Sequence, residues 1–114
     1  MFRHFFALML FVSATPLLAE ELSKEESCRY QGLVMSAVQQ ARLDRVKKAD
    51  VEQVIRASNP PWPDEVSNAI PPLVNHVYAM KRRDVRRNDL GPMLEQQCVE
   101  NWDQIQAMKN SLNN

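Results

Sequence analysis

A basic segment at residues 81–87 is the feature of this sequence best suited to bind a ligand. Its five cationic side chains are Lys81, Arg82, Arg83, Arg86 and Arg87. On a helix, residues four apart are neighbours, so Arg82 would lie next to Arg86, and Arg83 next to Arg87. Each guanidinium group can fork onto a carboxylate or a phosphate. We therefore expect an anionic partner: lipid headgroups, an acidic cell-surface polymer or an acidic protein.

The basic segment is also compatible with two purely structural roles. The first is a solvated helix end, where cations suit the negative end of the helix dipole. The second is pairing with the acidic start of the first helix, within the chain or across a homodimer. Those acidic residues are Glu20, Glu21, Glu25 and Glu26.

Other chemistry has less support in the sequence. His76 is the single histidine after residue 4, and a histidine without partners makes no catalytic constellation, so we expect it at the surface or at a rim. A metal site needs three or four suitably spaced ligands, and two glycines cannot form a phosphate-binding loop. We expect no enzyme, no metal and no cofactor.

The N-terminus has the features of a cleavable export signal. Arg3 and His4 give a short positive region, an apolar run follows at 5–12, and the small residue Ala19 ends the segment. We expect cleavage after Ala19, with Ala14 as the other candidate position.

The expected products are a signal peptide, residues 1–19, and one mature domain, residues 20–114. A membrane anchor fits less well, because a spanning helix needs about 20 apolar residues and the apolar stretch is shorter. The mature domain has 13 Lys and Arg against 14 Asp and Glu. This balance argues against a nucleic-acid partner. We expect a periplasmic or secreted protein without stable membrane insertion.

Both cysteines, Cys28 and Cys98, lie in the mature domain. Export places them in an oxidising compartment, where paired thiols persist as a disulfide. We expect an intramolecular Cys28–Cys98 bridge. Two free buried thiols and an intermolecular bridge are the alternatives.

Helix-forming residues and a helical spacing of apolar residues dominate the chain, which predicts an all-α domain of four to five helices. A first helix should begin at a capping box at Ser23 and end near 46–48. Its small residues Gly32 and Ser36 would let another helix approach closely. A second helix should begin at a capping box at Asp50 and stop before Pro60.

The third apolar run, from Asp64 to about Arg83, predicts a helix capped by Asp64 with a break at 70–71. A last helix should run from 90–92 to about Asn110. Trp62, between prolines, either presents an aromatic contact or covers the open end of the helical core. The positions of Tyr78 and Trp102 on apolar stripes predict that both belong to the core.

The mature chain resembles the small, uncharacterised exported helical proteins of Gram-negative bacteria. The residues that carry this resemblance are Cys28, Ala41-Arg42, His76-Val77-Tyr78 and Cys98, together with the signal peptide. The resemblance implies a periplasmic or secreted location and a disulfide, and it supplies no activity. In size and plan the chain is also similar to the acid-stress chaperones of the bacterial periplasm, which implies client binding at low pH.

Overall fold

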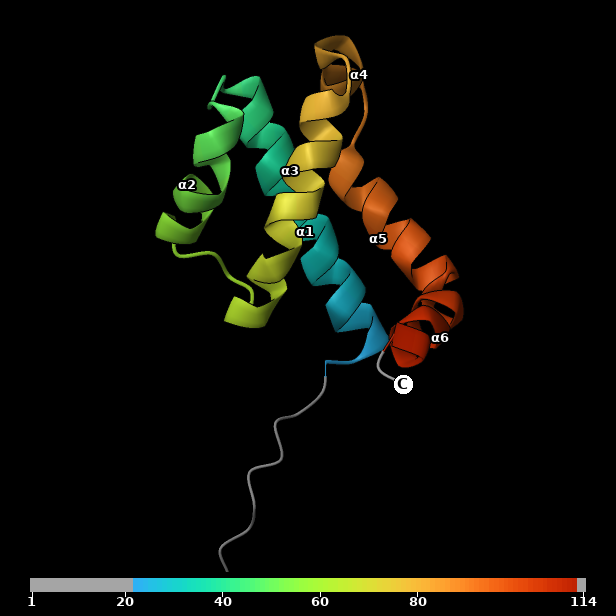
Figure 1. The fold of residues 1–114 in the computed structure, drawn as a ribbon. Helices are drawn as coiled ribbons and strands as arrows, with labels where there is room; N and C mark the ends of the chain where they lie inside the picture. The colour runs from blue at the N-terminus through green and yellow to red at the C-terminus, as the bar shows by residue number, and fades with distance from the viewer. Residues whose placement is uncertain (1–21, 113–114) are drawn as a thin grey trace, which may run out of the picture.

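The computed structural model describes residues 22–112 and shows an all-α domain (Figure 1). The expected signal peptide and its cleavage positions lie outside the described residues. Those residues form six α-helices and two short 3₁₀ helices. The predicted all-α class is therefore confirmed, whereas the predicted count of four to five helices is too low.

The first helix, α1, spans Lys24–Leu43 and begins where the sequence predicts. The Ser23 hydroxyl accepts a hydrogen bond from the Glu26 backbone N–H at 3.2 Å, which satisfies a free amide of the first turn. The predicted end at 46–48 is wrong. Arg45 has a φ of 65°, in the left-handed region, and this turn closes the helix earlier.

The second helix, α2, spans Val51–Ala57 and follows a 3₁₀ helix, η1, at Lys48–Asp50. The predicted capping box is wrong, because Asp50 belongs to η1 and its side chain accepts no hydrogen bond from the start of α2. The helix ends before Pro60 as predicted, since proline disfavours helical geometry in the residue before it.

The third apolar run forms a 3₁₀ helix, η2, at Asp64–Ala69 and then α3 at Ile70–Ala79. The predicted break at 70–71 is confirmed. Pro71 and Pro72 lie in the first turn of α3, where helical geometry requires no backbone N–H. The predicted cap at Asp64 is wrong, because this residue begins η2 and Pro63 occupies the cap position.

The predicted continuation of the third helix to Arg83 is also wrong. Met80 is extended, with a ψ of 152°, and it ends α3. A separate helix, α4, follows at Arg82–Arg87, with Lys81 at its cap position. The basic segment is therefore an independent short helix rather than the last turn of a longer one.

The predicted last helix is divided in two at Asn101. Helix α5 spans Leu90–Glu100 and helix α6 spans Trp102–Leu112. The Asn101 side chain donates a hydrogen bond to the Gln97 carbonyl at 2.9 Å. Asparagine side chains compete in this way for backbone groups, which favours a helix boundary.

Helix α1 is the centre of the domain and packs against α3 and α5 (Figure 1). Helix α2 packs against both α1 and α3, and α6 extends from the far end of α5. The buried core residues come from all of these helices except α6, with Trp62 from the α2–η2 connector. They are Val34, Met35, Val38, Ala41, Val51, Ile55, Trp62, Ile70, Val74, Val77, Val85 and Leu90.

The contact between α1 and α5 is the most extensive between helices of the described chain, and it is close at two glycines. A Cβ atom built on Gly32 would come within 2.9 Å of the Gly91 carbonyl oxygen, so glycines are needed on both helices. This confirms the predicted close approach at Gly32. The predicted disulfide is also confirmed: Cys28 on α1 and Cys98 on α5 are bonded, with Cα atoms 5.4 Å apart.

Candidate functional site

The basic segment lies at one end of the domain, on α4. Val85 is fully buried and anchors this short helix to the core. Four of the five cationic side chains, Lys81, Arg83, Arg86 and Arg87, are exposed. Arg82 is partly buried, so the predicted double row of free guanidinium groups lacks one member.

Arg82 instead holds α4 against the carboxyl end of α1. Its guanidinium group donates to the Leu43 carbonyl at 2.8 Å and to the Arg42 carbonyl at 3.5 Å. Both carbonyls lie in the last turn of α1, where backbone oxygens have no intrahelical donors. The positive charge also suits the negative end of the α1 dipole.

Gln39 fixes the other end of α4, and sequence reasoning missed it. Its side-chain amide donates to the Val85 carbonyl at 2.5 Å and to the Asn88 carbonyl at 2.6 Å. Its oxygen accepts from the Leu90 N–H at 3.3 Å. One glutamine of α1 therefore bonds the turn between α4 and α5 through its N–H groups and its oxygen. Nothing in the local sequence distinguishes Gln39 from the exposed glutamine that follows it.

A second cationic segment lies at the same end, in the turn between α1 and η1. Arg45, Lys47 and Lys48 are exposed there. The Tyr78 hydroxyl donates to the Val46 carbonyl at 2.6 Å, which ties this turn to the end of α3. The sequence shows that these three cations follow the first helix. It does not show that the fold brings them to the same end of the domain as α4.

Two partly buried groups connect the two segments. The Arg42 guanidinium lies over the Tyr78 ring, 5.1 Å from its centre, and also donates to the Met80 carbonyl at 3.5 Å. Burial raises the pKa of the Tyr78 hydroxyl, and the nearby Arg42 charge partly offsets this rise. These contacts link the end of α1 and the turn after it to the end of α3.

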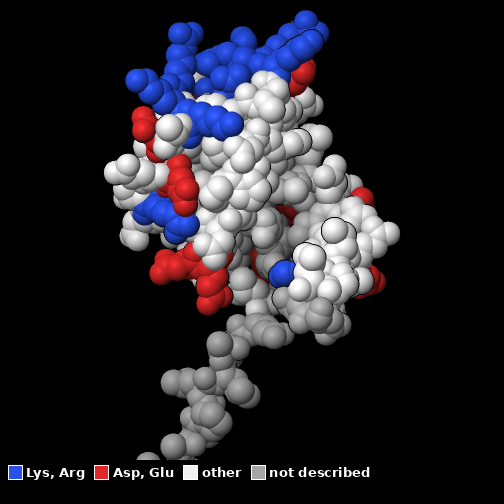
Figure 2. Space-filling view, in the orientation of Figure 1, with Lys and Arg blue, Asp and Glu red and all other residues white. Residues whose placement is uncertain are grey.

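We call the seven exposed cations of these two segments the cationic end. They are Arg45, Lys47, Lys48, Lys81, Arg83, Arg86 and Arg87. Figure 2 shows Lys and Arg along the upper edge of the molecule, with an acidic side chain beside them, while most of the visible Asp and Glu lie lower down. With Arg42 and Arg82, residues 42–50 and 81–89 hold nine cations and four carboxylates, a net charge of +5.

No residue of the cationic end forms an ion pair within the part of the chain that the structure describes. The ion pair found there joins Arg56 and Glu52, on the exposed side of α2. Glu25 and Glu26 therefore do not pair with the basic segment of the same chain, while Glu20 and Glu21 lie outside the described residues. Glu25 and Glu26 lie at the opposite end of a 20-residue helix, about 30 Å away. Pairing across a homodimer stays a prediction.

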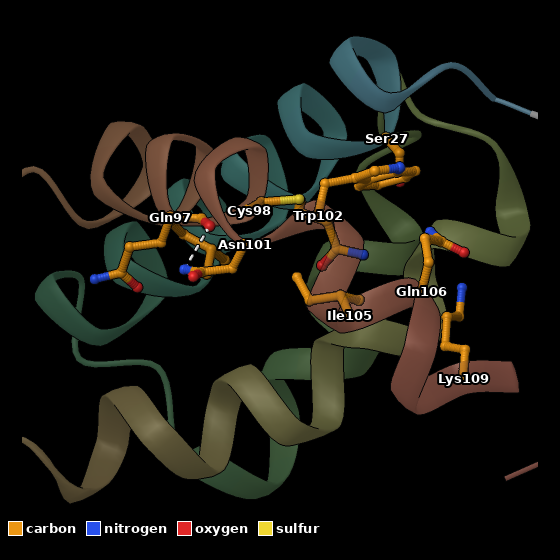
Figure 3. A pocket seen from close by; sticks show the side chains of 10 residues that line it. Ser27, Gln97, Cys98, Asn101, Trp102, Ile105, Gln106 and Lys109 are labelled. Atoms are coloured by element: carbon orange, nitrogen blue, oxygen red, sulfur yellow. Dashed lines mark hydrogen bonds between the residues drawn. The ribbon is translucent and has the colours of Figure 1, made fainter. Parts of the chain in front are cut away.

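A groove lies at the end of the domain opposite to the cationic end. It has a volume of about 490 Å³ and is bounded by α1, α5 and α6. Figure 3 shows Trp102 beside Ser27, with Ile105, Gln106 and Lys109 along α6. Tyr78 packs against the core as predicted, but Trp102 is partly buried away from it, so its predicted place in the core is wrong. It lies outside the core because the break at Asn101 turns α6 away from it.

The remaining residues singled out in the sequence lie apart from both features. Trp62 is buried and its ring N–H donates to the Ser67 hydroxyl at 2.8 Å, which matches the prediction that it covers the core. His76 is exposed at the rim of a shallow hollow between α3 and α5. Within residues 22–112 no three His, Cys, Asp or Glu side chains lie close enough to hold a metal ion.

The fold and the site define an all-α domain, closed by one disulfide, with most of its cations at one end. None of the helices in the described part of the chain has the length and apolar character to cross a bilayer. Comparisons with protein-family models, with curated proteins and with solved structures found no match to this chain.

Proposed function

We propose that this domain is an exported interaction module that binds an anionic partner through its cationic end. The observation that carries the proposal is the gathering of seven exposed cations from two segments, none of them in an ion pair within residues 22–112. Helix capping accounts for Arg82 alone. Since like charges held together repel one another, the others are best accounted for by a partner of opposite charge.

Export is part of the proposal. The disulfide between Cys28 and Cys98 suits an oxidising compartment. Residues 1–19 are proposed as a signal peptide that is cut after Ala19, which leaves the module in the periplasm or outside the cell. The proposed activity is binding without catalysis, to an anionic surface or to a protein rather than to nucleic acid.

The test is retention of the purified oxidised domain on a sulfated polysaccharide, heparin, used as a general polyanion. We expect retention that weakens as salt rises, because exposed charges are screened. The variant Arg83→Gln/Arg86→Gln/Arg87→Gln should elute at clearly lower salt.

A matched control removes three cations outside the cationic end. Lys24→Gln/Arg29→Gln/Lys109→Gln has the same net charge as the test variant and should elute close to the natural protein. Equal losses in the two variants would mean that only net charge matters. Such a result would contradict a site at the cationic end.

A stress chaperone is the second candidate, and a different observation favours it. Helix α6 exposes Ile105, Met108 and Leu112, with exposed fractions of 37%, 66% and 83%. Exposed apolar surface of this kind is able to bind unfolded clients. This function predicts suppressed aggregation of a client protein at pH 3 and a loss of that effect in Met108→Ser/Leu112→Ser. A domain that is rigid and inactive at pH 3 would exclude it.

A further inference from the structure

We propose that the cationic end docks onto the surface of an anionic phospholipid bilayer, with the carboxyl end of α1 toward the lipid and α6 away from it. This inference rests on the proposed function and names its partner. The ligand groups are the phosphates of the lipid headgroups. Binding is peripheral and electrostatic, since it is carried by the seven exposed cations.

The first argument is that both cationic segments are held at one end. Arg82 bonds the end of α1 at 2.8 Å, and Tyr78 bonds the following turn at 2.6 Å. Gln39 bonds the turn after α4. The two segments thus keep a fixed spacing, and their cations extend across the whole upper edge of the molecule (Figure 2). A broad charged edge of this kind fits an extended anionic surface.

The second argument is chemical. Clusters of four to eight Lys and Arg are typical of segments that bind anionic lipids, and each cation near such a surface adds about the same increment of binding. Arginines such as Arg83, Arg86 and Arg87 fork onto phosphate oxygens, while Lys47, Lys48 and Lys81 act as point charges. The cationic end contains enough groups for this kind of binding without any other contact.

The third argument favours a bilayer over a protein. Protein interfaces need an apolar centre from which charged side chains are depleted. At the cationic end the apolar side chain of α4, Val85, is fully buried, and the Tyr78 hydroxyl is bonded to the backbone. The exposed apolar residues of α6 lie at the other end, beside the start of α1. None of the exposed large apolar side chains lies within residues 42–50 or 81–89, and Val54 and Met93 lie on α2 and α5, so the two segments offer charge without an apolar anchor of their own.

The test is sedimentation of the oxidised domain with lipid vesicles at low and high salt. One set of vesicles is pure phosphatidylcholine, and the other is an equal mixture of phosphatidylcholine and phosphatidylglycerol. We expect binding to the mixed vesicles alone, and its loss at high salt. Loss of one cation should weaken partitioning about fivefold, so a triple variant should lose on the order of 100-fold.

Two triple variants test the two segments separately. Arg83→Gln/Arg86→Gln/Arg87→Gln changes α4, and Arg45→Asn/Lys47→Gln/Lys48→Gln changes the other segment. Asparagine is chosen because it tolerates the left-handed backbone at position 45. Both variants should lose partitioning to a similar extent, while Lys24→Gln/Arg29→Gln/Lys109→Gln should keep it. If only the α4 variant lost partitioning to the mixed vesicles, the proposal that both segments contact the bilayer would be overturned.

Lipids with brominated acyl chains test the orientation. Trp62 is buried in the core and Trp102 lies beside the groove, so neither fluorescence should be quenched on binding. Quenching of Trp102 would mean that α6 inserts, which would overturn the proposed orientation. Retention on heparin without vesicle binding would exclude the bilayer but leave the proposed function, with an acidic protein or polymer as partner. Binding to neither would contradict both.

Discussion

At the scale of single residues, neighbouring arginines of identical charge have different roles. Arg82 is partly buried and bonds two backbone carbonyls of α1, whereas the Arg83 side chain is exposed and makes no hydrogen bond to the described part of the chain. One position therefore stabilises the fold and the next is available to a ligand. Substituting the two separately distinguishes a structural role from a binding role.

Arg82→Ala should lower the free energy of unfolding by about 1 kcal/mol, because α1 loses the charged donor at its last carbonyls and the site is partly exposed. Arg83→Ala should leave it within about 0.5 kcal/mol, as is usual for a surface substitution. Urea denaturation of both variants measures the difference. Binding to heparin should weaken in Arg83→Ala even though its stability is unchanged. Equal stability of the two variants would contradict the role of Arg82 in capping α1.

Tyr78 predicts a loss of stability in alkali. Burial raises the pKa of its hydroxyl, so the folded protein holds this proton more tightly than the unfolded chain does. The stabilisation is complete below the ordinary tyrosine pKa of about 10 and is lost as the pH rises through the raised value. Urea denaturation across this range should show a smaller fall in Tyr78→Phe than in the natural protein. An equal fall in both would mean that another group causes it.

At the scale of helices, local signals predicted where helices exist but not where they end. Ser23 caps α1 and the proline pair begins α3 as the sequence predicted. The ends at Arg45, Met80 and Asn101 differ from prediction. The apolar spacing continues through the last two of these positions. At Met80 the carbonyl accepts a hydrogen bond from the distant Arg42, whereas at Asn101 the side chain bonds the nearby Gln97 carbonyl.

The candidate site was predicted only in part, because contacts between distant residues cannot be read from the local sequence. Residues 81–87 are consecutive, so their charge is visible in the sequence. The contribution of Arg45, Lys47 and Lys48 depends on a fold that brings them beside residues more than 30 positions away. The role of Gln39 is likewise invisible, because its partners lie 46 to 51 residues further along the chain.

The close contact of α1 with α5 predicts that Gly91→Ala is destabilising. An added Cβ would overlap the Ser36 hydroxyl and lie 2.7 Å from the Gly32 carbonyl oxygen. Separating the helices to relieve this contact should cost about 1–3 kcal/mol, the usual range for overpacking. Thermal and urea denaturation give this value.

The double variant Ser36→Ala/Gly91→Ala is the control for that experiment. It removes the hydroxyl but leaves the contact with the backbone of α1, which cannot move aside as a side chain does. It should therefore recover only part of the lost stability. Full recovery would mean that the serine side chain alone, and not the backbone approach, requires glycine at this position.

At the scale of the whole molecule, the cationic end and the exposed apolar residues of α6 lie at opposite ends of α1. The carboxyl end of this helix carries the cationic end, and its amino end borders the groove and α6. Outside the two cationic segments, the described residues have four cations and eight carboxylates. Near the anionic surface proposed above, this asymmetry would turn the cationic end toward the surface before contact, over a distance of about a Debye length.

The disulfide is a covalent constraint on the fold and gives the last prediction. It joins the first turns of α1 to α5 and closes a loop of 70 residues. In the chain-entropy model such a loop contributes about 4 kcal/mol by restricting the unfolded state. A domain of this size has about 5–15 kcal/mol in total. Cys28→Ala/Cys98→Ala should therefore unfold at much lower urea than the oxidised protein does.

The same variant separates stability from binding. The cationic end is held by Arg82, Gln39 and Tyr78, none of which touches the disulfide, whereas the groove contains Cys98 itself. At a temperature where the variant is still folded, its retention on heparin should equal that of the natural protein. A folded variant that no longer binds would show that the disulfide positions the cationic end. In that case the hydrogen bonds around α4 would be insufficient to maintain the binding surface.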